Sequence, residues 1–391
     1  MPQPSVLPTP RRGGPLTIGV ASVGVLAGLG LSAVPAGQAG AVTIRDQQTH
    51  AVQDAALITD SGAPLEAVSG NLVQVGVASG VYLGDGWVLT AAHFNPNTGG
   101  RTDVTFDSGF STGGDVFRNP DWTGDFVDGN DFALIRLDSA PADLPDVQLF
   151  GGGSEELAGQ TVTFFGYGLN GKGSSGTNQP GSTTGNLHAG QNRIDQLGGT
   201  VFNNNDAFVD QVAFFDFDRP NSAIDNPLGS RFALEFESML ASGDSGGGVF
   251  VTDEDGTARL AGVNSLLFSP SNRPPAGYGS VGAATTVDGI LAWIADVTND
   301  VVVQTGDANL NGTVEQGDLN AVLNNWGAVG GSWSTGDLNA DGIVDQADLN
   351  AVLNNWGESN APSLNGVLTV PEPGLAGLGV VVALAMMHRR R

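Results

Sequence analysis

Short apolar runs broken by Gly, Asn and Asp dominate the chain between about residues 42 and 301. Runs of this kind predict β-strands separated by turns, and we expect a mainly β fold there. The 59 glycines and the single lysine also favour turn-rich sheet over charged helical bundles. We expect a surface loop over residues 168–190 and one helix near Asp288–Val297. The clearest strand candidates are Asn71–Val77, Gly86–Thr90, Phe132–Leu137, Thr161–Tyr167 and Gly248–Val251.

Composition narrows the class of protein further. The 391 residues carry 15 basic and 41 acidic side chains, and this net charge of −26 argues against nucleic acid as a partner. A hydrophobic content of 40% is enough to build a core, and the length allows two or three domains. Because the chain has no cysteine, it has no disulfides, zinc–thiolate sites or thiol nucleophile.

The N-terminal residues 1–41 have the pattern of a secretory signal. Arg11 and Arg12 precede an apolar run over residues 16–34, and Ala39-Gly40-Ala41 offers a small-residue cleavage site. We expect an exported mature chain that begins near Val42. An uncleaved membrane anchor is the alternative.

The C-terminal residues 368–391 have a related order of features. Pro371-Glu372-Pro373 precedes an apolar stretch over residues 374–387 and then three terminal arginines. The stretch is shorter than the ~20 residues of a transmembrane helix. This order resembles the PEP-CTERM sorting signal of Gram-negative-type bacteria. The resemblance implies recognition by an exosortase and a final place at the cell surface, in the outer membrane or outside the cell. An ordinary tail anchor is the alternative.

A duplicated segment lies between these ends. Asp318–Gly327 recurs unchanged at Asp348–Gly357, thirty residues later, and an acidic loop precedes each copy. Oxygen-bearing side chains stand at the first, third, fifth, ninth and twelfth loop positions, with glycine at the sixth. This is the spacing of a calcium-binding EF-hand loop. The candidate ligands are Asp307, Asn309, Asn311, Thr313 (by its carbonyl), Glu315 and Asp318, then Asp337, Asn339, Asp341, Ile343 (by its carbonyl), Asp345 and Asp348.

Apolar residues recur at helical spacing after each loop, so each copy predicts a loop followed by one helix. The pair resembles a dockerin domain over residues 304–358, and two helical faces of this kind can pack on each other. The resemblance implies two Ca²⁺ sites and a cohesin-like partner. Loop positions ten and eleven hold Gln316-Gly317 and Gln346-Ala347, not the small hydroxyl residues frequent in cohesin binders. The alternative is a pair of acidic turns that bind no metal. We expect calcium removal to unfold this module and to leave the rest of the chain largely intact.

Three local motifs carry the candidate chemistry. Gly86–His93 is a strand that runs into a small-residue turn ending in histidine, and Gly129–Leu137 places Asp131 at the start of an apolar strand. Ser242–Gly247 holds Ser245 between glycines. Together, in this order, they resemble the trypsin-like serine proteases. The resemblance covers residues 42–301 and implies two six-stranded antiparallel β-barrels.

The resemblance also implies roles for these residues. Ser245 would be the nucleophile, His93 its general base and Asp131 the residue that orients the imidazole, while the backbone N–H groups of Gly243 and Ser245 would form an oxyanion hole. Catalysis would need no cofactor. Asp125 and Asp128 compete with Asp131, but they lie in a polar segment.

Substrate preference follows from the same resemblance. Met239 stands where an acid would select Arg or Lys, so basic specificity is disfavoured. Ser265 falls in the segment that pairs with the substrate backbone, Gly282 falls on a pocket wall, and Leu267 would narrow the pocket. These residues predict a small or apolar side chain at the cleaved position. Relatives activate by placing a new N-terminal ammonium beside the acid before the serine, here Asp244, and Val42 could supply it.

The sequence therefore predicts an exported serine endopeptidase that acts on protein or peptide substrates, with a calcium-binding dockerin and a sorting tail. One rival is a non-catalytic adhesin or scaffold component that acts through its dockerin. A second rival is a processing enzyme for one cell-surface partner rather than a general degrader.

Overall fold

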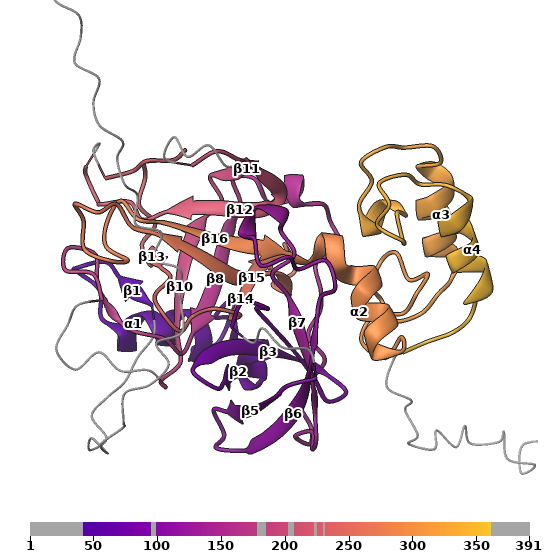
Figure 1. Ribbon diagram of the computed structural model, residues 1–391, viewed down its shortest axis with the longest axis horizontal. Coiled ribbons are helices and arrows are strands. Elements are labelled where there is room, and N and C mark those ends of the chain that lie inside the picture. Colours follow the sequence, from indigo (N-terminus) through magenta and orange to yellow (C-terminus); the bar gives the residue numbers. More distant parts are fainter. Residues whose placement is uncertain are drawn as a thin grey trace, which may run out of the picture.

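The computed structural model describes residues 42–94, 99–177, 185–201, 207–222, 225–229 and 231–360. Two β-structures lie together, and a small helical module follows the last strand (Figure 1). The predicted signal peptide and the predicted sorting tail lie outside the described residues. None of the helices in the described ranges combines the length and the apolar character that a membrane crossing requires.

The first β-structure is a closed barrel in the strand order β2-β3-β4-β7-β6-β5, with every neighbouring pair antiparallel. Closure removes the exposed strand edges that invite aggregation. Valine, isoleucine and aromatic side chains fill its interior. The strands are β2 (Leu72–Val75), β3 (Ala78–Gly84), β4 (Trp87–Thr90), β5 (Arg101–Phe106), β6 (Ser111–Arg118) and β7 (Ala133–Leu137).

The second β-structure is a seven-stranded antiparallel sheet in the order β10-β8-β14-β15-β16-β12-β11. Its core cluster includes four large aromatic side chains that are almost fully buried: Phe164, Phe215, Phe217 and Tyr278. The strands are β8 (Thr161–Gly166), β10 (His188–Arg193), β11 (Gln196–Gly199), β12 (Phe208–Asp216), β14 (Gly248–Thr252), β15 (Ala258–Phe268) and β16 (Val281–Thr286).

The prediction of a second six-stranded barrel therefore needs correction. Only Ile194 and Asp195 separate the two edge strands β10 and β11, so the sheet is strongly curled. Where the segment from β10 to β11 approaches β12, Asn192 Nδ2 donates to Asp216 O and Asp195 N donates to Phe214 O. These contacts replace a regular ladder, and the sheet stays open. The predicted loop over residues 168–190 also differs, because it contains the short strand β9 (Gly171–Lys172) and the start of β10.

The first described residues are tied into the second β-structure. β1 (Thr43–Ile44) pairs antiparallel with β13 (Ser238–Met239) and parallel with β9, which makes a separate three-stranded sheet. Helix α1 (His50–Asp54) begins at a Thr49 cap, since the Thr49 side chain accepts from Val52 N. It continues into η1 (Ala55–Thr59), and η2 (Glu66–Asn71) then leads into β2. Further short turns are η3 (Phe126–Asp128) and η4 (Ser154–Leu157).

The helical module follows α2. The predicted helix near residues 288–297 is a short turn, η5 (Val287–Ile290), followed by α2 (Leu291–Thr298), which ends where Asn299 turns left-handed at φ 53°. The two repeats give α3 (Gln316–Asn324) and α4 (Gln346–Asn354), and η6 (Trp333–Thr335) lies between them. Asp318 and Asp348 cap their own helices by accepting from the backbone N–H three residues earlier.

The two repeated helices bury only part of their apolar faces. Val322 and Val352 are fully buried and pack in one cluster with Leu319 and Leu349. The later apolar residues of each copy remain about half exposed; they are Leu323, Trp326, Leu353 and Trp356. Mutual packing of the predicted faces therefore holds for the first leucine and the valine of each copy, and not for the later leucine and tryptophan.

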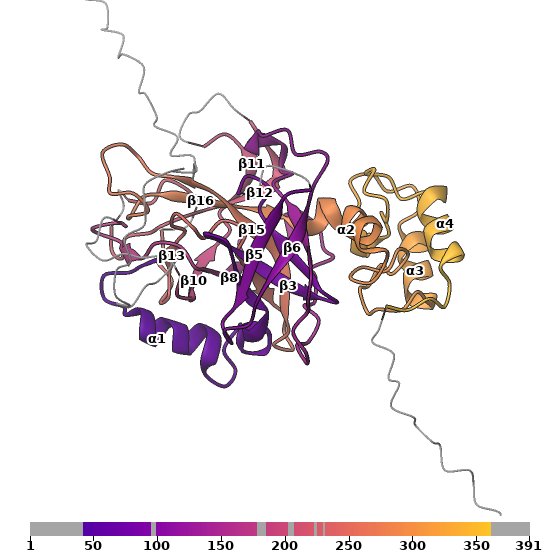
Figure 2. The same ribbon diagram turned by 60° about the horizontal axis from the view of Figure 1, so that its bottom comes forward.

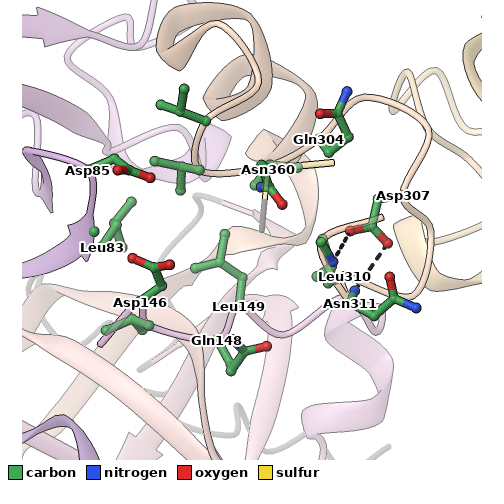
Figure 3. Close-up of a pocket in the computed structure, with 16 residues that line it drawn as sticks. Leu83, Asp85, Asp146, Gln148, Leu149, Gln304, Asp307, Leu310, Asn311 and Asn360 are labelled. Carbon is green, nitrogen blue, oxygen red and sulfur yellow. Dashed lines mark hydrogen bonds between the residues drawn. The ribbon is translucent and has the colours of Figure 1, made fainter. Parts of the chain in front are cut away.

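The module lies beyond α2 (Figure 2), and it packs against the β-structures rather than standing free. One hydrophobic cluster includes Leu83 of β3, Leu149 of the segment that bridges to β15, and Val314 and Trp333 of the module. Ser334 N also donates to Gly151 O at 2.8 Å. Beside this contact lies a hollow of about 140 Å³, where Asp85, Asp146 and Leu149 face Leu310 and Asp307 of the module (Figure 3).

Candidate active site

His93, Asp131 and Ser245 lie within hydrogen-bond distance of one another. His93 Nε2 lies 2.9 Å from Ser245 Oγ, and His93 Nδ1 lies 2.7 Å from Asp131 Oδ2. The backbone N–H of His93 also donates to Asp131 Oδ1 at 2.8 Å. The carboxylate therefore fixes both the ring and the backbone of the histidine.

Strand pairing explains this meeting. β4 leads into His93, Asp131 precedes β7, and the pairing of Thr90 with Ala133 brings the two residues to the same end of the barrel. Ser245 lies in the turn between β13 and β14, and its carbonyl accepts from Ser79 N of β3 at 2.9 Å. The site is thus assembled where the two β-structures meet.

The surroundings of Asp131 set it apart from the two competing acids. Asp131 is buried, and Ser265 Oγ donates to its Oδ2 at 2.5 Å. Asp125 accepts instead from Val127 N, and Asp128 accepts from Thr123 Oγ1, both within their own loop. Sequence reasoning assigned Ser265 to the substrate backbone and missed this contact, because the pairing of distant residues cannot be read from one segment.

The histidine ring is also held by an aromatic neighbour. Phe126, in η3, meets His93 edge to face with ring centroids 5.3 Å apart, and Trp122 packs on Phe126 in the same manner. Edge-to-face pairs of this kind restrict the ring planes. The imidazole is therefore oriented by both a hydrogen bond and packing.

The turn that carries Ser245 needs glycine at Gly243. Its φ is +99°, and a Cβ there would lie 2.6 Å from Gly168 Cα. Within the described chain, neither Gly243 N nor Ser245 N donates to another protein group. The two predicted oxyanion-hole donors therefore form no hydrogen bond with the described residues.

A small hollow of about 10 Å³ opens beside Ser245. Its lining is apolar apart from two hydroxyls and one amide; it comprises Leu240, Ala241, Ser245, Asn264, Ser265, Leu266 and Leu267. Met239 and Gly282, both predicted to bind substrate, do not line it. Met239 is fully buried, and a Cβ on Gly282 would lie 2.9 Å from its sulfur. The two residues are close to each other, and Gly282 pairs with the lining residue Leu267 across β15 and β16.

Asp244 lies on the opposite side of this turn, in the protein interior. Its carboxylate accepts from the backbone N–H groups of Ala241, Gly168 and Val42. Burial raises the pKa of Asp244 to about 7, and these hydrogen bonds counteract the rise. Val42 itself is fully buried, with φ +66°, which is strained for a β-branched residue.

The two acidic loops of the module have nearly identical internal hydrogen bonds. Asp307 accepts from the backbone of Asn311 and Gly312, and Asp337 accepts from Asp341 and Gly342 in the same way. The described residues contain no group of three or more His, Cys, Asp or Glu side chains placed to hold a metal. The predicted ligand sets also use asparagine oxygens and one carbonyl in each loop.

The charge in these loops is uncompensated within the described chain. Asp307, Asp318, Asp337 and Asp348 are buried, and no lysine or arginine of the described residues forms a salt bridge with them. Burial raises the pKa of Asp307 to about 6 and raises that of Asp337. Oxygen ligands with excess negative charge suit a hard divalent cation, so the residues present fit Ca²⁺.

The fold is mainly β, and His93, Asp131 and Ser245 form one hydrogen-bonded row of side chains within it. Residues 78–258 match the family model described as a trypsin-like peptidase domain. The matched segment runs from β3 to the start of β15 and includes all three of these residues. The match supports a trypsin-like serine protease, which acts on protein or peptide substrates. No curated protein matches the chain.

Proposed function

We propose that the chain is a serine endopeptidase in which Ser245 attacks the scissile carbonyl. The 2.9 Å contact between His93 Nε2 and Ser245 Oγ carries this proposal. A neutral hydroxyl is a weak nucleophile, so His93 accepts its proton as the new C–O bond forms. Asp131 holds Nδ1–H and stabilises the imidazolium. The proton then passes to the leaving amine, which leaves an acyl-enzyme that water hydrolyses.

The backbone donors would stabilise the negative oxygen of the tetrahedral intermediate. Gly243 N and Ser245 N are the two N–H groups, and each such donor typically contributes ~3 kcal/mol to transition-state stabilisation. The proposal is tested by treating the purified protein with a fluorophosphonate, which reacts with activated serines. We expect the label on Ser245. A protein that stays unlabelled would favour the non-catalytic adhesin or scaffold instead.

We predict a preference for small apolar side chains at the cleaved position. The hollow beside Ser245 has no charged lining residue, and Leu266 and Leu267 restrict its size. Peptide substrates with Ala or Val there should show kcat/KM at least about tenfold above those with Arg or Lys, since an unpaired buried charge is costly. The Leu267→Gly variant should widen the accepted range. Equal rates for Arg and Ala substrates would contradict the prediction.

We also propose that residues 304–358 form a dockerin-like module with two Ca²⁺ sites, one for each predicted ligand set. The repeated loop geometry and the uncompensated charge support it. A bound Ca²⁺ would supply the missing positive charge in each loop and thereby hold the loop to its helix. A cohesin-like protein remains the proposed partner, although the residues at loop positions ten and eleven are not those frequent in cohesin binders.

Calcium removal should destabilise the protease region together with the module. The expectation that the module unfolds alone treated it as an independent unit, whereas Val314 and Trp333 share one hydrophobic cluster with Leu83 and Leu149. We therefore expect a chelator to lower the Tm at which activity is lost, by several degrees or more.

Matched variants separate the two loops. Asp318→Asn changes the loop nearer the barrel, and Asp348→Asn changes the second loop. The first substitution should lower the temperature at which activity is lost by more than the second does. Differential scanning calorimetry with an activity assay in parallel measures both effects. An activity-loss temperature that does not change with chelator would contradict the coupling.

For the termini we propose export and sorting. Residues 1–41 would direct export and then be removed, and an exosortase-type enzyme would process residues 368–391. Both proposals rest on the order of charged, apolar and small residues in the sequence. Export would place the enzyme at the cell surface, in the outer membrane or outside the cell.

A further inference from the structure

The three carbonyl groups just before Ser245 each accept a hydrogen bond. Ser242 O accepts from Leu169 N at 2.8 Å, and Gly243 O accepts from Ser79 Oγ at 2.9 Å. Asp244 O accepts from Gly247 N at 3.0 Å and from Asn264 Nδ2 at 3.1 Å. A trans peptide points its N–H away from its C=O. The groups that hold Ser242 O and Asp244 O therefore set the directions of Gly243 N–H and Ser245 N–H.

Among these groups, Asn264 Nδ2 is the side-chain donor that acts on the peptide between Asp244 and Ser245. Asn264 is 1% exposed, lies on β15, and also donates from Nδ2 to Phe165 O at 2.8 Å. Its backbone N donates to Gly247 O and its backbone O accepts from Gly246 N, both at 2.8 Å. Asn264 thus contacts the turn at three points.

The side-chain oxygen of Asn264 indicates that this residue does more than fill space in the core. Asn264 Oδ1 is buried and has no hydrogen-bond partner among the described residues. A buried acceptor without a partner costs stability, so an apolar side chain of similar size would be expected if packing alone determined this position. The Nδ2 donors, which bind Phe165 O and Asp244 O, therefore account for asparagine at this position.

We propose that Asn264 is a positioning residue for the oxyanion hole. Through Asp244 O it fixes the peptide that carries Ser245 N–H, so that this donor faces the carbonyl oxygen of the substrate. The inference rests on the proposed serine-protease function and adds a residue to it. Asn264 does not touch the reacting atoms in this role, since its effect passes through one backbone peptide.

Asn264→Val tests the proposal, because valine removes the donors at similar size. Loss of a whole oxyanion donor costs about 10²–10³ in kcat, and a misaligned donor should cost less. We expect kcat to fall about 10- to 100-fold with KM within about threefold of the starting protein. Affinity for a peptide aldehyde, which forms a tetrahedral adduct, should fall in parallel. Affinity for a peptide amide that forms no adduct should stay unchanged.

Asn71→Val is the matched control. Asn71 is also buried, donates from Nδ2 to two carbonyls (Tyr82 O and Pro145 O, both at 2.8 Å), and has an unpartnered Oδ1. Its variant should lose comparable stability but keep kcat within about twofold, since it does not contact the turn.

Each outcome decides the question. A kcat loss no larger than that of Asn71→Val, or a loss in KM alone, overturns the role of Asn264 while the protease proposal stands. A starting protein without hydrolysis or fluorophosphonate labelling overturns the protease proposal itself. If Asn264→Val does not fold, Asn264→Thr, which keeps one donor, replaces it and should show an intermediate kcat. Failure of both variants to fold would make Asn264 a structural residue only.

Discussion

Replacing Ser245 with alanine is expected to lower kcat for peptide hydrolysis by about 10⁴–10⁶-fold, because residues that act as a unit fail together. The 2.7 Å contact between His93 and Asp131 does not involve Ser245 and should persist. The residual rate would come from substrate binding and from the backbone N–H donors. Steady-state kinetics on a peptide amide measures the loss, and the fluorophosphonate label should disappear.

Ser242→Ala is the matched control for this experiment. Ser242 lies three residues earlier in the same turn, and its carbonyl, which the substitution keeps, accepts from Leu169 N. This variant should keep its label and most of its activity. The nucleophile assignment would be wrong if Ser245→Ala lost less than about tenfold, or if both variants lost activity equally while retaining their folded Tm.

A protein that keeps even one residue ahead of Val42 is expected to hydrolyse peptides at least about 100-fold more slowly than one that begins at Val42. The Val42 N–H already bonds to the buried Asp244 carboxylate, and β1 anchors the next two residues to Met239 and its neighbour. Cleavage before Val42 would turn this N–H into an ammonium and would remove the strained φ, which an N-terminal residue does not have. Asp244 then fixes the turn that carries Gly243 and Ser245.

Three preparations test this expectation: a chain that starts at Val42, one with an added glycine, and one with an acetylated Val42. The acetyl group removes the charge while it adds little volume. Asp244→Asn in the chain that starts at Val42 should abolish the higher hydrolysis rate, because the ion pair between the ammonium and residue 244 cannot form. Equal rates for the free and the acetylated chains would contradict the proposed role of the ammonium.

The pH dependence of stability gives a second readout. In the uncleaved chain, burial raises the pKa of Asp244 to about 7, well above its value in the unfolded chain. The unfolded state then loses its proton first, so stability falls as the pH rises from about 4 to about 7. An ammonium beside Asp244 would lower this pKa and remove the fall. The Tm advantage of the cleaved chain should therefore grow with pH across this range.

Much of the fold could be predicted from local pattern. β2, β4, β7, β8 and β14 lie within one or two residues of the predicted runs, because each run is short, apolar and bounded by turn residues. The mainly β class is confirmed, as is the helix after β16. The curl that leaves the second sheet open could not be predicted, since it depends on how β10 and β11 meet β12 across the sheet.

The candidate site could likewise be predicted only in part from local patterns. The motifs identified His93, Asp131 and Ser245, which the fold brings together, although their catalytic roles stay predictions. The bond from Ser265 to Asp131 and the link from Asn264 to Asp244 join segments far apart in sequence, so no local pattern indicated them. Met239 and Gly282 were predicted by counting along the chain, and counting could not show that they lie close together outside the lining of the hollow.

Sequence identity between the two repeated helices does not give them identical surroundings. Leu310, in the first loop, packs near Gly151 of the protease region, and Trp333 Nε1 donates to the Asp307 carbonyl. The corresponding residue of the second loop, Ala340, has no such neighbour among the described contacts of that region. Substitutions at the fourth loop position should therefore change the contact with the β-structures in the first copy but not in the second, although both copies bury a valine in the same cluster.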